Sequence, residues 1–321
     1  MKKFLVHLML GLAACGPAAL MAQDYPAKPV TLVNGFAPGG NADIVARLVA
    51  QKMGEVLGQQ MVVENRAGAA SMIANEYVAR SQPDGYRLLL VSGAFPTQAA
   101  TLANLPFDPL RDFTWVSLLI SYPLVVTVNA DSPLKTLADL IRSAKASPGK
   151  LNYPSPGNGS LFHLATEVFN ASAGIEMTHV PFKGGSQQLT ELMAGRLDVM
   201  FDTLSVVQPA IRSGRLRALA VTSPQRSAQL PGAPTAAELL PGYEASSFLG
   251  IAGPPGLAPA IVERLNAATR KVVDLAEIRQ RFAELGGEPR AGSPEEMARY
   301  VAAAIAKWKA IADAKNIRAT N

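Results

Sequence analysis

The chain has 321 residues, of which 49% are hydrophobic, and it is too long for one ordinary compact domain. We therefore expect two lobes. The formal net charge is +5, which falls to +3 when Lys2 and Lys3 are left out, and no block of Lys or Arg stands out in the rest of the chain. The composition therefore argues against a nucleic-acid partner. The single cysteine, Cys15, excludes an internal disulfide.

The first residues have the pattern of a bacterial secretory signal peptide, in which two lysines precede an apolar run (4–14) and small residues follow. That run is too short for a membrane span. We predict cleavage after Ala22, which gives a signal peptide of residues 1–22 and a periplasmic mature protein. An alternative stays open, because residues 12–15 are similar to a lipobox, which would make Cys15 a lipid-modified N-terminus. The remaining sequence has no run of eighteen apolar residues.

From Pro29 onward, short apolar runs alternate with amphipathic segments, which is the pattern of sheets covered by helices. In the first lobe (23–123) we predict strands at 30–33, 61–63 and 86–91 and helices at 42–57 and 71–81. In the second lobe (124–223) we predict strands at 124–128, 151–153, 197–201 and 216–222 and helices at 134–146, 160–171 and 186–194.

The last segment (224–321) is predicted to return mainly to the first lobe and to end in helices, at 259–285 and 294–312. A chain that leaves one lobe, builds a second and returns makes a double connection. Such a connection is a hinge that allows closure around a ligand.

Three glycine turns lie at predicted strand-to-helix junctions, at 37–43, 154–160 and 183–186. In open sheets, ligands collect at the carboxyl ends of strands, where the N-terminal amides of helices converge. Free amides and the helix dipole favour an anion at such a place. A single glycine turn of this kind usually has no role in binding. Together, and divided between two lobes, they predict a cleft that binds a carboxylate.

Two side chains near these turns have two interpretations each. His163 lies in the first turn of a helix that Ser160 is suited to cap, and it either contacts ligand or makes a structural hydrogen bond. Asp202 is predicted to lie just past the carboxyl end of a strand. There it either accepts a hydrogen bond from an amino or hydroxyl group of the ligand or caps the segment 203–211.

A series of short motifs runs through the chain in a fixed order. They are Tyr25 to Pro29, Phe36 to Gly40, Glu64 to Ala69, Pro83 to Tyr86, Leu105 to Pro109 with Asp112 and Phe113, Tyr153 to His163, Val180 to Gly184, Gly195 to Asp198, Phe201 with Asp202, and Leu219 to Ser223. In this order the motifs resemble the substrate-binding proteins of the tripartite tricarboxylate transporter system, also called the Bug family, over essentially the whole mature chain.

The resemblance implies an α/β fold of the two-lobed type II periplasmic-binding-protein class, each lobe a mostly parallel sheet flanked by helices. It implies a monomer that holds a carboxylate on backbone amides of one loop from each lobe and passes it to membrane permease subunits. No cofactor and no metal are expected. Together the turns and the resemblance indicate the ligand-binding positions Phe36, Ala37, Gly39, Gly40, Asn41, Asp43, Ser92, Gly157, Asn158, Gly159, Ser160, His163, Phe182, Lys183 and Asp202.

The sequence departs from the family pattern at three places that would line the cleft. Asn34 and Gly35 stand where the family usually has a hydrophobic residue and proline, and Asn41 stands where it commonly has Ser or Thr. The segment 92–97 also differs from the usual glycine- and threonine-rich form. These departures bear on which carboxylate is bound, and the sequence leaves that open.

Two other functions use the same fold. An enzyme on this fold has little support, because the sequence has no G-x-S-x-G, H-E-x-x-H, P-loop or dinucleotide-binding motif and no cysteine beyond Cys15. A periplasmic sensor that presents its liganded form to a histidine kinase requires the same closure as transport. The sequence does not separate these two roles.

Overall fold

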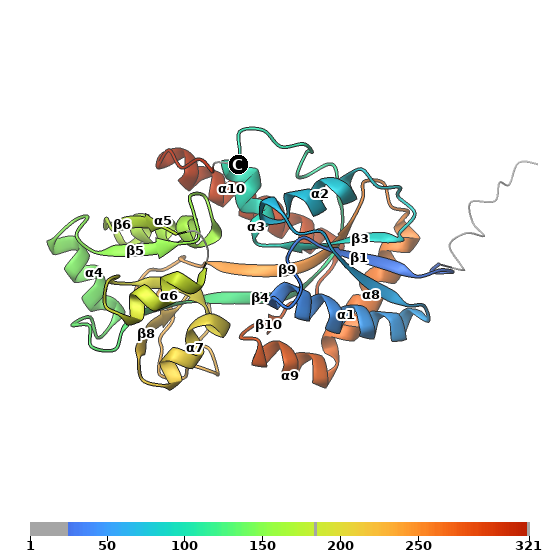
Figure 1. Cartoon of the computed structure of the whole chain (residues 1–321). Helices are drawn as coiled ribbons and strands as arrows, with labels where there is room; N and C mark the ends of the chain where they lie inside the picture. The colour runs from blue at the N-terminus through green and yellow to red at the C-terminus, as the bar shows by residue number, and fades with distance from the viewer. Residues whose placement is uncertain (1–24, 183–184, 320–321) are drawn as a thin grey trace, which may run out of the picture.

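The computed structural model of the chain describes residues 25–182 and 185–319. The predicted signal peptide, Cys15 and Lys183 lie outside the described residues. Figure 1 shows two α/β lobes side by side, joined in the middle by the strands β4 (Thr114–Asn129) and β9 (Ser246–Gly253).

The first lobe has a mixed sheet with the strand order β10-β4-β9-β3-β1-β2. Its parallel part consists of β1 (Val30–Asn34), β2 (Met61–Asn65) and β3 (Arg87–Ser92), and β10 is Glu288–Pro289. One face packs against α1 (Asn41–Leu57), α8 (Pro259–Asp274) and α9 (Ala276–Glu284). The other face packs against α2 (Met72–Ala79), which follows the short helix η2 (Ala69–Ser71), α3 (Ala94–Thr101) and the first half of α10 (Pro294–Ala314).

The second lobe is built around the other half of β4, which pairs with β7 (Met200–Thr203) and β8 (Leu216–Val221). The parallel pair β5 (Asn152–Ser155) and β6 (Thr178–Pro181) lies beside β7. The helices are α4 (Leu137–Ala146), α5 (Leu161–Ala173), α6 (Gly185–Met193), α7 (Leu204–Arg212) and η3 (Ala236–Glu238). The last turns of α10 belong to the core of this lobe through Trp308 and Ile311.

The helices that position the site have clear local causes. α1 buries Val45, Val49 and Met53 at helical spacing against the sheet and ends at Gly58, whose φ of 77° favours glycine. α5 begins at Ser160, whose side chain accepts a hydrogen bond from the N–H of His163. The first turn of each helix therefore lies at a fixed place relative to its sheet.

A single buried threonine ties together the two segments that cross between the lobes. β4 is paired with β9 as far as Pro123 and with β7 from Leu124 onward. The N–H of Leu124 donates to Oγ1 of Thr222 at 2.7 Å, and that hydroxyl in turn donates to the carbonyl of Ala245. Thr222 is fully buried. Its side chain thus connects the outgoing and the returning chain at the hinge.

Some strands differ from the sequence prediction. β4 begins at Thr114, ten residues before the predicted strand at 124, and β9 was not predicted at all. Both are buried on both faces, and serines in β4 and glycine in β9 interrupt the apolar run that would mark a buried strand. In β9, Gly250 also lowers the strand propensity, yet a Cβ there would lie 3.0 Å from the carbonyl oxygen of Ser117.

Two further differences concern element bounds. β7 covers Met200–Thr203 instead of 197–201, so Asp202 lies within the strand and not past its end. The predicted helix 259–285 is interrupted at Leu275, which has extended backbone angles between α8 and α9. The sheets are mixed and not mostly parallel, because pairing is antiparallel wherever β4 or β9 takes part. The lobe boundaries stay predictions.

We predict that Thr222→Val destabilises the protein by about 1–3 kcal/mol, because valine keeps the shape but leaves the N–H of Leu124 and the carbonyl of Ala245 buried without their partner. The measurement is chemical denaturation. Thr269→Val is the matched control, since Thr269 is equally buried and its hydroxyl donates to the carbonyl of Leu265 and lies 3.8 Å from Sδ of Met53, both away from the hinge. Equal losses in the two variants would show that the hinge hydroxyl has no special role.

Candidate functional site

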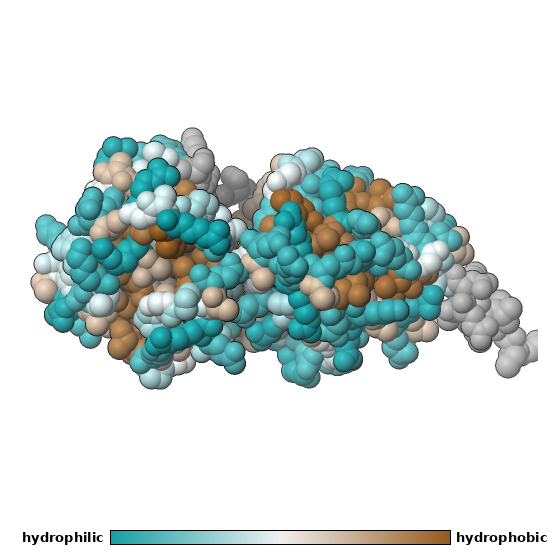
Figure 2. Space-filling view, turned by 90° about the horizontal axis from the view of Figure 1, so that it is seen from below, coloured by the Kyte–Doolittle hydropathy of each residue, from teal (hydrophilic) through white to brown (hydrophobic). Residues whose placement is uncertain are grey.

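The loops that precede α1 and α5 face each other across the junction of the lobes. In Figure 1 the N-terminal end of α1 points toward the second lobe, and the N-terminal end of α5 points toward the first. Figure 2 shows the two lobes from below as two rounded masses with a notch between them. On the other side, the loop before α5 approaches the first lobe, because a Cβ on Gly159 would lie 3.0 Å from Oγ1 of Thr101.

In the first lobe, the carboxylate of Asp43 shapes the loop 36–40. Its Oδ2 accepts hydrogen bonds from the N–H of Gly39 and from Nε of Arg47, both at 2.9 Å. Its Oδ1 accepts from Nδ2 of Asn65 at 2.8 Å, and the same amide donates to the carbonyl of Phe36 at 3.0 Å. The Arg47 guanidinium holds the pKa of Asp43 down to about 2, against the opposing effect of burial. Asp43 is therefore ionised and engaged within the protein.

In the second lobe, two histidines support the loop 156–160. Nδ1 of His163 accepts from the N–H of Gly159 at 3.2 Å. Oγ of Ser155 accepts from the N–H of Gly157 at 3.2 Å and lies 2.6 Å from Nε2 of His179. The two imidazole rings are stacked, with centroids 3.7 Å apart and planes 14° apart. Of the two interpretations of His163, the structure shows the structural hydrogen bond.

The role of His179 is not visible in the sequence, because nothing in its local sequence distinguishes it from an ordinary strand residue. It reaches the loop only because β5 and β6 are paired in register, Tyr153 opposite His179.

The histidine pair is uncharged at neutral pH. Burial lowers the pKa of His163 from 6.5 to about 4. Burial and the neighbouring His163 lower the pKa of His179 to about 4, with Glu167 acting in the opposite direction. Glu167 accepts a hydrogen bond from the Tyr153 hydroxyl at 2.6 Å, which places a satisfied carboxylate behind the rings. A neutral Nδ1 on His163 is what accepts the Gly159 N–H.

The two histidines predict a loss of stability in mild acid. Both folded pKa values lie below the ordinary 6.5, so between pH 6.5 and about 4 the unfolded chain binds protons that the folded protein does not. Stability is therefore unaffected by the pair above pH 6.5 and falls as the pH decreases toward 4. His163→Asn keeps an acceptor for Gly159 but does not titrate, so its melting temperature should fall less steeply over this range. Parallel curves for the two proteins would contradict this account.

The amides left for a ligand are those of the first helical turns. The glycines do not supply them, because the N–H groups of Gly39, Gly157 and Gly159 are bonded within the protein. The first N–H groups of a helix have no partner inside the helix. In α1 these include the N–H groups of residues 41–42, and in α5 those of residues 161–162. Both helix ends carry the positive end of the dipole. Helix ends of this kind favour an anion.

The glycines act by leaving space. Gly39 has a φ of 83° and Gly157 a φ of 138°, and a Cβ on either would meet no atom within 4 Å. Ala37, Gly39, Gly40 and Asn158 are exposed, and Phe36, Asn41 and Ser160 are partly buried. The open side of each loop is thus free of protein atoms.

The other predicted residues lie at the ends of neighbouring strands. Ser92 ends β3 and accepts a hydrogen bond from the N–H of Ala94 at 3.3 Å. Phe182 follows β6, is partly buried and donates its N–H to the carbonyl of Ser155 at 2.8 Å. Lys183 lies outside the described residues.

Asp202 is 6% exposed, and Oδ1 of its carboxyl accepts from the N–H of Thr203, the residue before α7, at 2.7 Å. Burial raises the pKa of this carboxyl from 3.8 to about 6, against the opposing effect of the Thr203 N–H. At neutral pH the ionised form is thus disfavoured by its surroundings.

We predict that Asp202→Asn stabilises the protein at neutral pH. The folded state keeps a proton on Asp202 up to about pH 6, which the unfolded chain releases near pH 3.8, so the natural protein loses stability as the pH rises through this range. Asparagine keeps the acceptor and carries no charge. The gain should be on the order of 2 kcal/mol at pH 7.5 and should vanish near pH 4. A gain that is the same at both pH values would contradict it.

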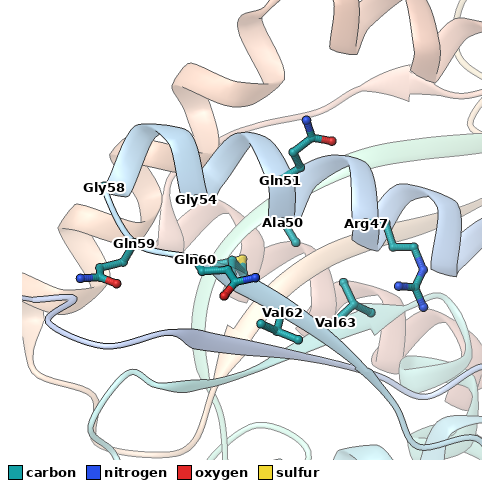
Figure 3. A pocket seen from close by; sticks show the side chains of 10 residues that line it. Arg47, Ala50, Gln51, Gly54, Gly58, Gln59, Gln60, Val62 and Val63 are labelled. Carbon is teal, nitrogen blue, oxygen red and sulfur yellow. The ribbon is translucent and has the colours of Figure 1, made fainter.

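Two cavities lie away from these loops. A groove of about 670 Å³ follows the outer edge of the first lobe between α1 and β2, with Arg47 at one end and Gln59 at the other (Figure 3). A smaller cavity of about 190 Å³ lies between the start of β9 and α10. Neither is lined by the loops 36–40 or 156–160, so the candidate site is defined by helix ends and hydrogen bonds and not by cavity size.

Within residues 25–182 and 185–319, no three His, Cys, Asp or Glu side chains are grouped so as to hold a metal ion. The same part of the chain contains no helix with the length and apolar character that a membrane crossing requires.

Comparison with known proteins agrees with this architecture. The family model described as "Tripartite tricarboxylate transporter family receptor" matches residues 45–317. Protein BugT of Bordetella pertussis is 34% identical over 315 residues, which are 97% of each chain. The structure of Rpa4515 from R. palustris with adipate is 36% identical, has a TM-score of 0.79 and covers 92% of this chain and 99% of that one.

The structure of MatC from Rhodopseudomonas palustris with bound malate is 31% identical, has a TM-score of 0.73 and covers 89% of this chain and 99% of that one. The fold is thus the α/β periplasmic-binding-protein fold. The chain belongs to the tripartite tricarboxylate transporter receptor family. Its members are periplasmic solute-binding proteins and not enzymes.

Proposed function

We propose that this protein captures one small carboxylate between the N-terminal ends of α1 and α5 and delivers it to the membrane subunits of a tripartite tricarboxylate transporter. It acts in the periplasm as a monomer, after export by the signal peptide 1–22.

One observation carries the proposal. Two helices from different lobes direct their N-termini at the same junction, and the loops before them are held in place by internal hydrogen bonds that leave the first-turn amides free. A carboxylate accepts several hydrogen bonds and is stabilised by both dipoles. Because each helix belongs to a different lobe, binding favours closure about the hinge.

The names of two relatives support the ligand class. Rpa4515 was solved with adipate and MatC with malate, and both molecules are dicarboxylates. Sequence identity of 36% and 31% with these proteins makes the same head group the first candidate here.

The test is calorimetric titration of the mature protein with a panel of organic acids and the matching amides. We expect one acid to bind with micromolar or tighter affinity, which is about −8 kcal/mol or better, and its amide to bind far more weakly. Binding only of cations or neutral sugars would contradict the proposal. For delivery, we expect that cells that carry the permease genes take up this acid only when the binding protein is present.

We predict that Gly39→Val abolishes binding of that acid while the protein stays folded. A valine there occupies the open side of the loop and strains a φ of 83°. Gly58→Val is the matched control, because Gly58 lies at the other end of α1 with a φ of 77° and equally open surroundings. Both variants should lose about 1–2 kcal/mol of stability from backbone strain, but only Gly39→Val should lose the ligand. Retained affinity in Gly39→Val would remove this loop from the site.

A further inference from the structure

The two outer edges of the first-lobe sheet differ. At one edge β4 is covered, because it pairs with β10 and its backbone meets later parts of the chain. The N–H of Arg290 donates to the carbonyl of Leu119 at 3.0 Å, and Nδ2 of Asn266 donates to the carbonyl of Val116 at 2.8 Å. At the other edge β2 is the last strand, and the groove of about 670 Å³ lies beside it (Figure 3). The β2 edge therefore has room for a further strand.

Alternate residues of β2 direct their backbone groups away from β1. The carbonyl of Gln60 accepts from the N–H of Val30 at 2.9 Å. The N–H of Arg66 donates to the carbonyl of Asn34 at 2.8 Å. The even-numbered residues along β2 thus pair with β1, and Val63 directs its N–H and C=O to the open edge. Within residues 25–182 and 185–319, neither of these two groups has a hydrogen-bond partner.

The β2 edge is apolar and regular. Charges, prolines and bulges protect strand edges from pairing with another chain. Residues 61–63 are Met, Val and Val, and their register with β1 is continuous. The side chain of Val62 is 44% exposed. Across the groove, α1 presents the small residues Ala50 and Gly54, and Gly58 follows at its end. These walls suit an extended segment with apolar side chains.

Arg47 is the one charged side chain among the described residues that line the groove. Its Nε donates to Oδ2 of Asp43 at 2.9 Å, and its Nη2 donates to Oδ1 of Asn65 at 3.1 Å. The Arg47 side chain is 56% exposed, and the guanidinium has further N–H groups for a second carboxylate. An acidic residue is therefore complementary to this end of the groove.

We propose that the β2 edge binds an extended segment of a membrane subunit of the transporter, which adds a strand beside Val63 and places an acidic residue on Arg47. Extended segments bind sheet edges in this way, through main-chain hydrogen bonds. The inference rests on the proposed delivery function, which requires a surface that the membrane subunits recognise. Arg47 also connects this surface to the carboxylate site, because it holds Asp43, which in turn holds the N–H of Gly39.

The first experiment is cross-linking to the purified permease subunits in proteoliposomes, with and without the acid found by the calorimetric panel. Cys15 is the only cysteine of the chain, so the protein from residue 23 onward has none. Val62→Cys labelled with a photo-crosslinker should cross-link to a permease subunit. Leu239→Cys is the matched control, because Leu239 is 49% exposed and lies at the end of η3 in the second lobe. It should cross-link at least tenfold less.

The second experiment separates docking from ligand binding. Val63→Pro removes the N–H that faces the open edge and keeps the pairing of residues 62 and 64 with β1, and proline is tolerated in edge strands. Its affinity for the acid should equal that of the natural protein, and uptake by cells that carry the permease genes should fall at least tenfold. Val62→Glu should reduce uptake more than Val62→Lys, since only glutamate repels an acidic segment. Thermal unfolding confirms that each variant is folded.

Three results would overturn the inference while the proposed function stands. They are equal cross-linking from positions 62 and 239, undiminished uptake with Val63→Pro, and equal effects of glutamate and lysine at position 62. A dimer of the natural protein in gel filtration that Val63→Pro dissociates would show that a second copy of the chain occupies the edge instead. If the natural protein binds no carboxylate or supports no uptake, the proposed function fails and this inference fails with it.

Discussion

The site depends on one constraint: the loops before α1 and α5 must satisfy their own polar groups without using the first-turn amides. In the first lobe the ionised carboxylate of Asp43 does this by holding the Gly39 N–H, with Arg47 and Asn65 holding the carboxylate in turn. In the second lobe the neutral histidines do it, His163 directly and His179 through Ser155. One loop uses a charged acceptor and the other uses uncharged ones, yet both leave a helix N-terminus free. The free amides and the dipole behind them then favour an anion.

The hinge makes these two ends act on one ligand. β4 is a single strand that belongs to both sheets, and Thr222 connects it to the returning chain. Helix α10 also spans the junction, with Met297 in the core of the first lobe and Trp308 in the core of the second. The closure that we propose takes place about these crossings, and its energy comes from contacts that a ligand makes with both helix ends. A carboxylate with several acceptor positions is suited to make them.

Backbone amides suit the carboxylate of the proposed ligand, so the side chains around them are left to distinguish the rest of the molecule. In this chain Asn34 and Asn41 are departures from the family pattern beside the first-lobe loop, and the side chain of Asn41 hydrogen-bonds the Tyr122 hydroxyl of β4. Asp202 contributes a carboxyl whose burial disfavours charge, and it is held by the N–H that follows it. In this proposal backbone amides bind the carboxylate of the ligand, and side chains contact the rest of the ligand.

The sequence by itself determined the α/β class, the family and the two loops, because the glycine turns and the ordered motifs are local patterns. It also determined helices with one exposed face, such as α1, and strands with an uninterrupted apolar run, such as β1. It did not determine β9 or the first half of β4, because Ser117 and Ser121 in β4 and Gly250 in β9 interrupt the apolar runs that mark a buried strand. Only the tertiary structure decided that Asp43 and His163 hold the loops. Their acceptor atoms bind the N–H groups of Gly39 and Gly159, and a ligand would have to compete with these N–H groups for them. Only it brought His179 to Ser155 and Tyr122 to Asn41, because those contacts come from strand register and from the crossing of the chain between lobes, which no local pattern encodes.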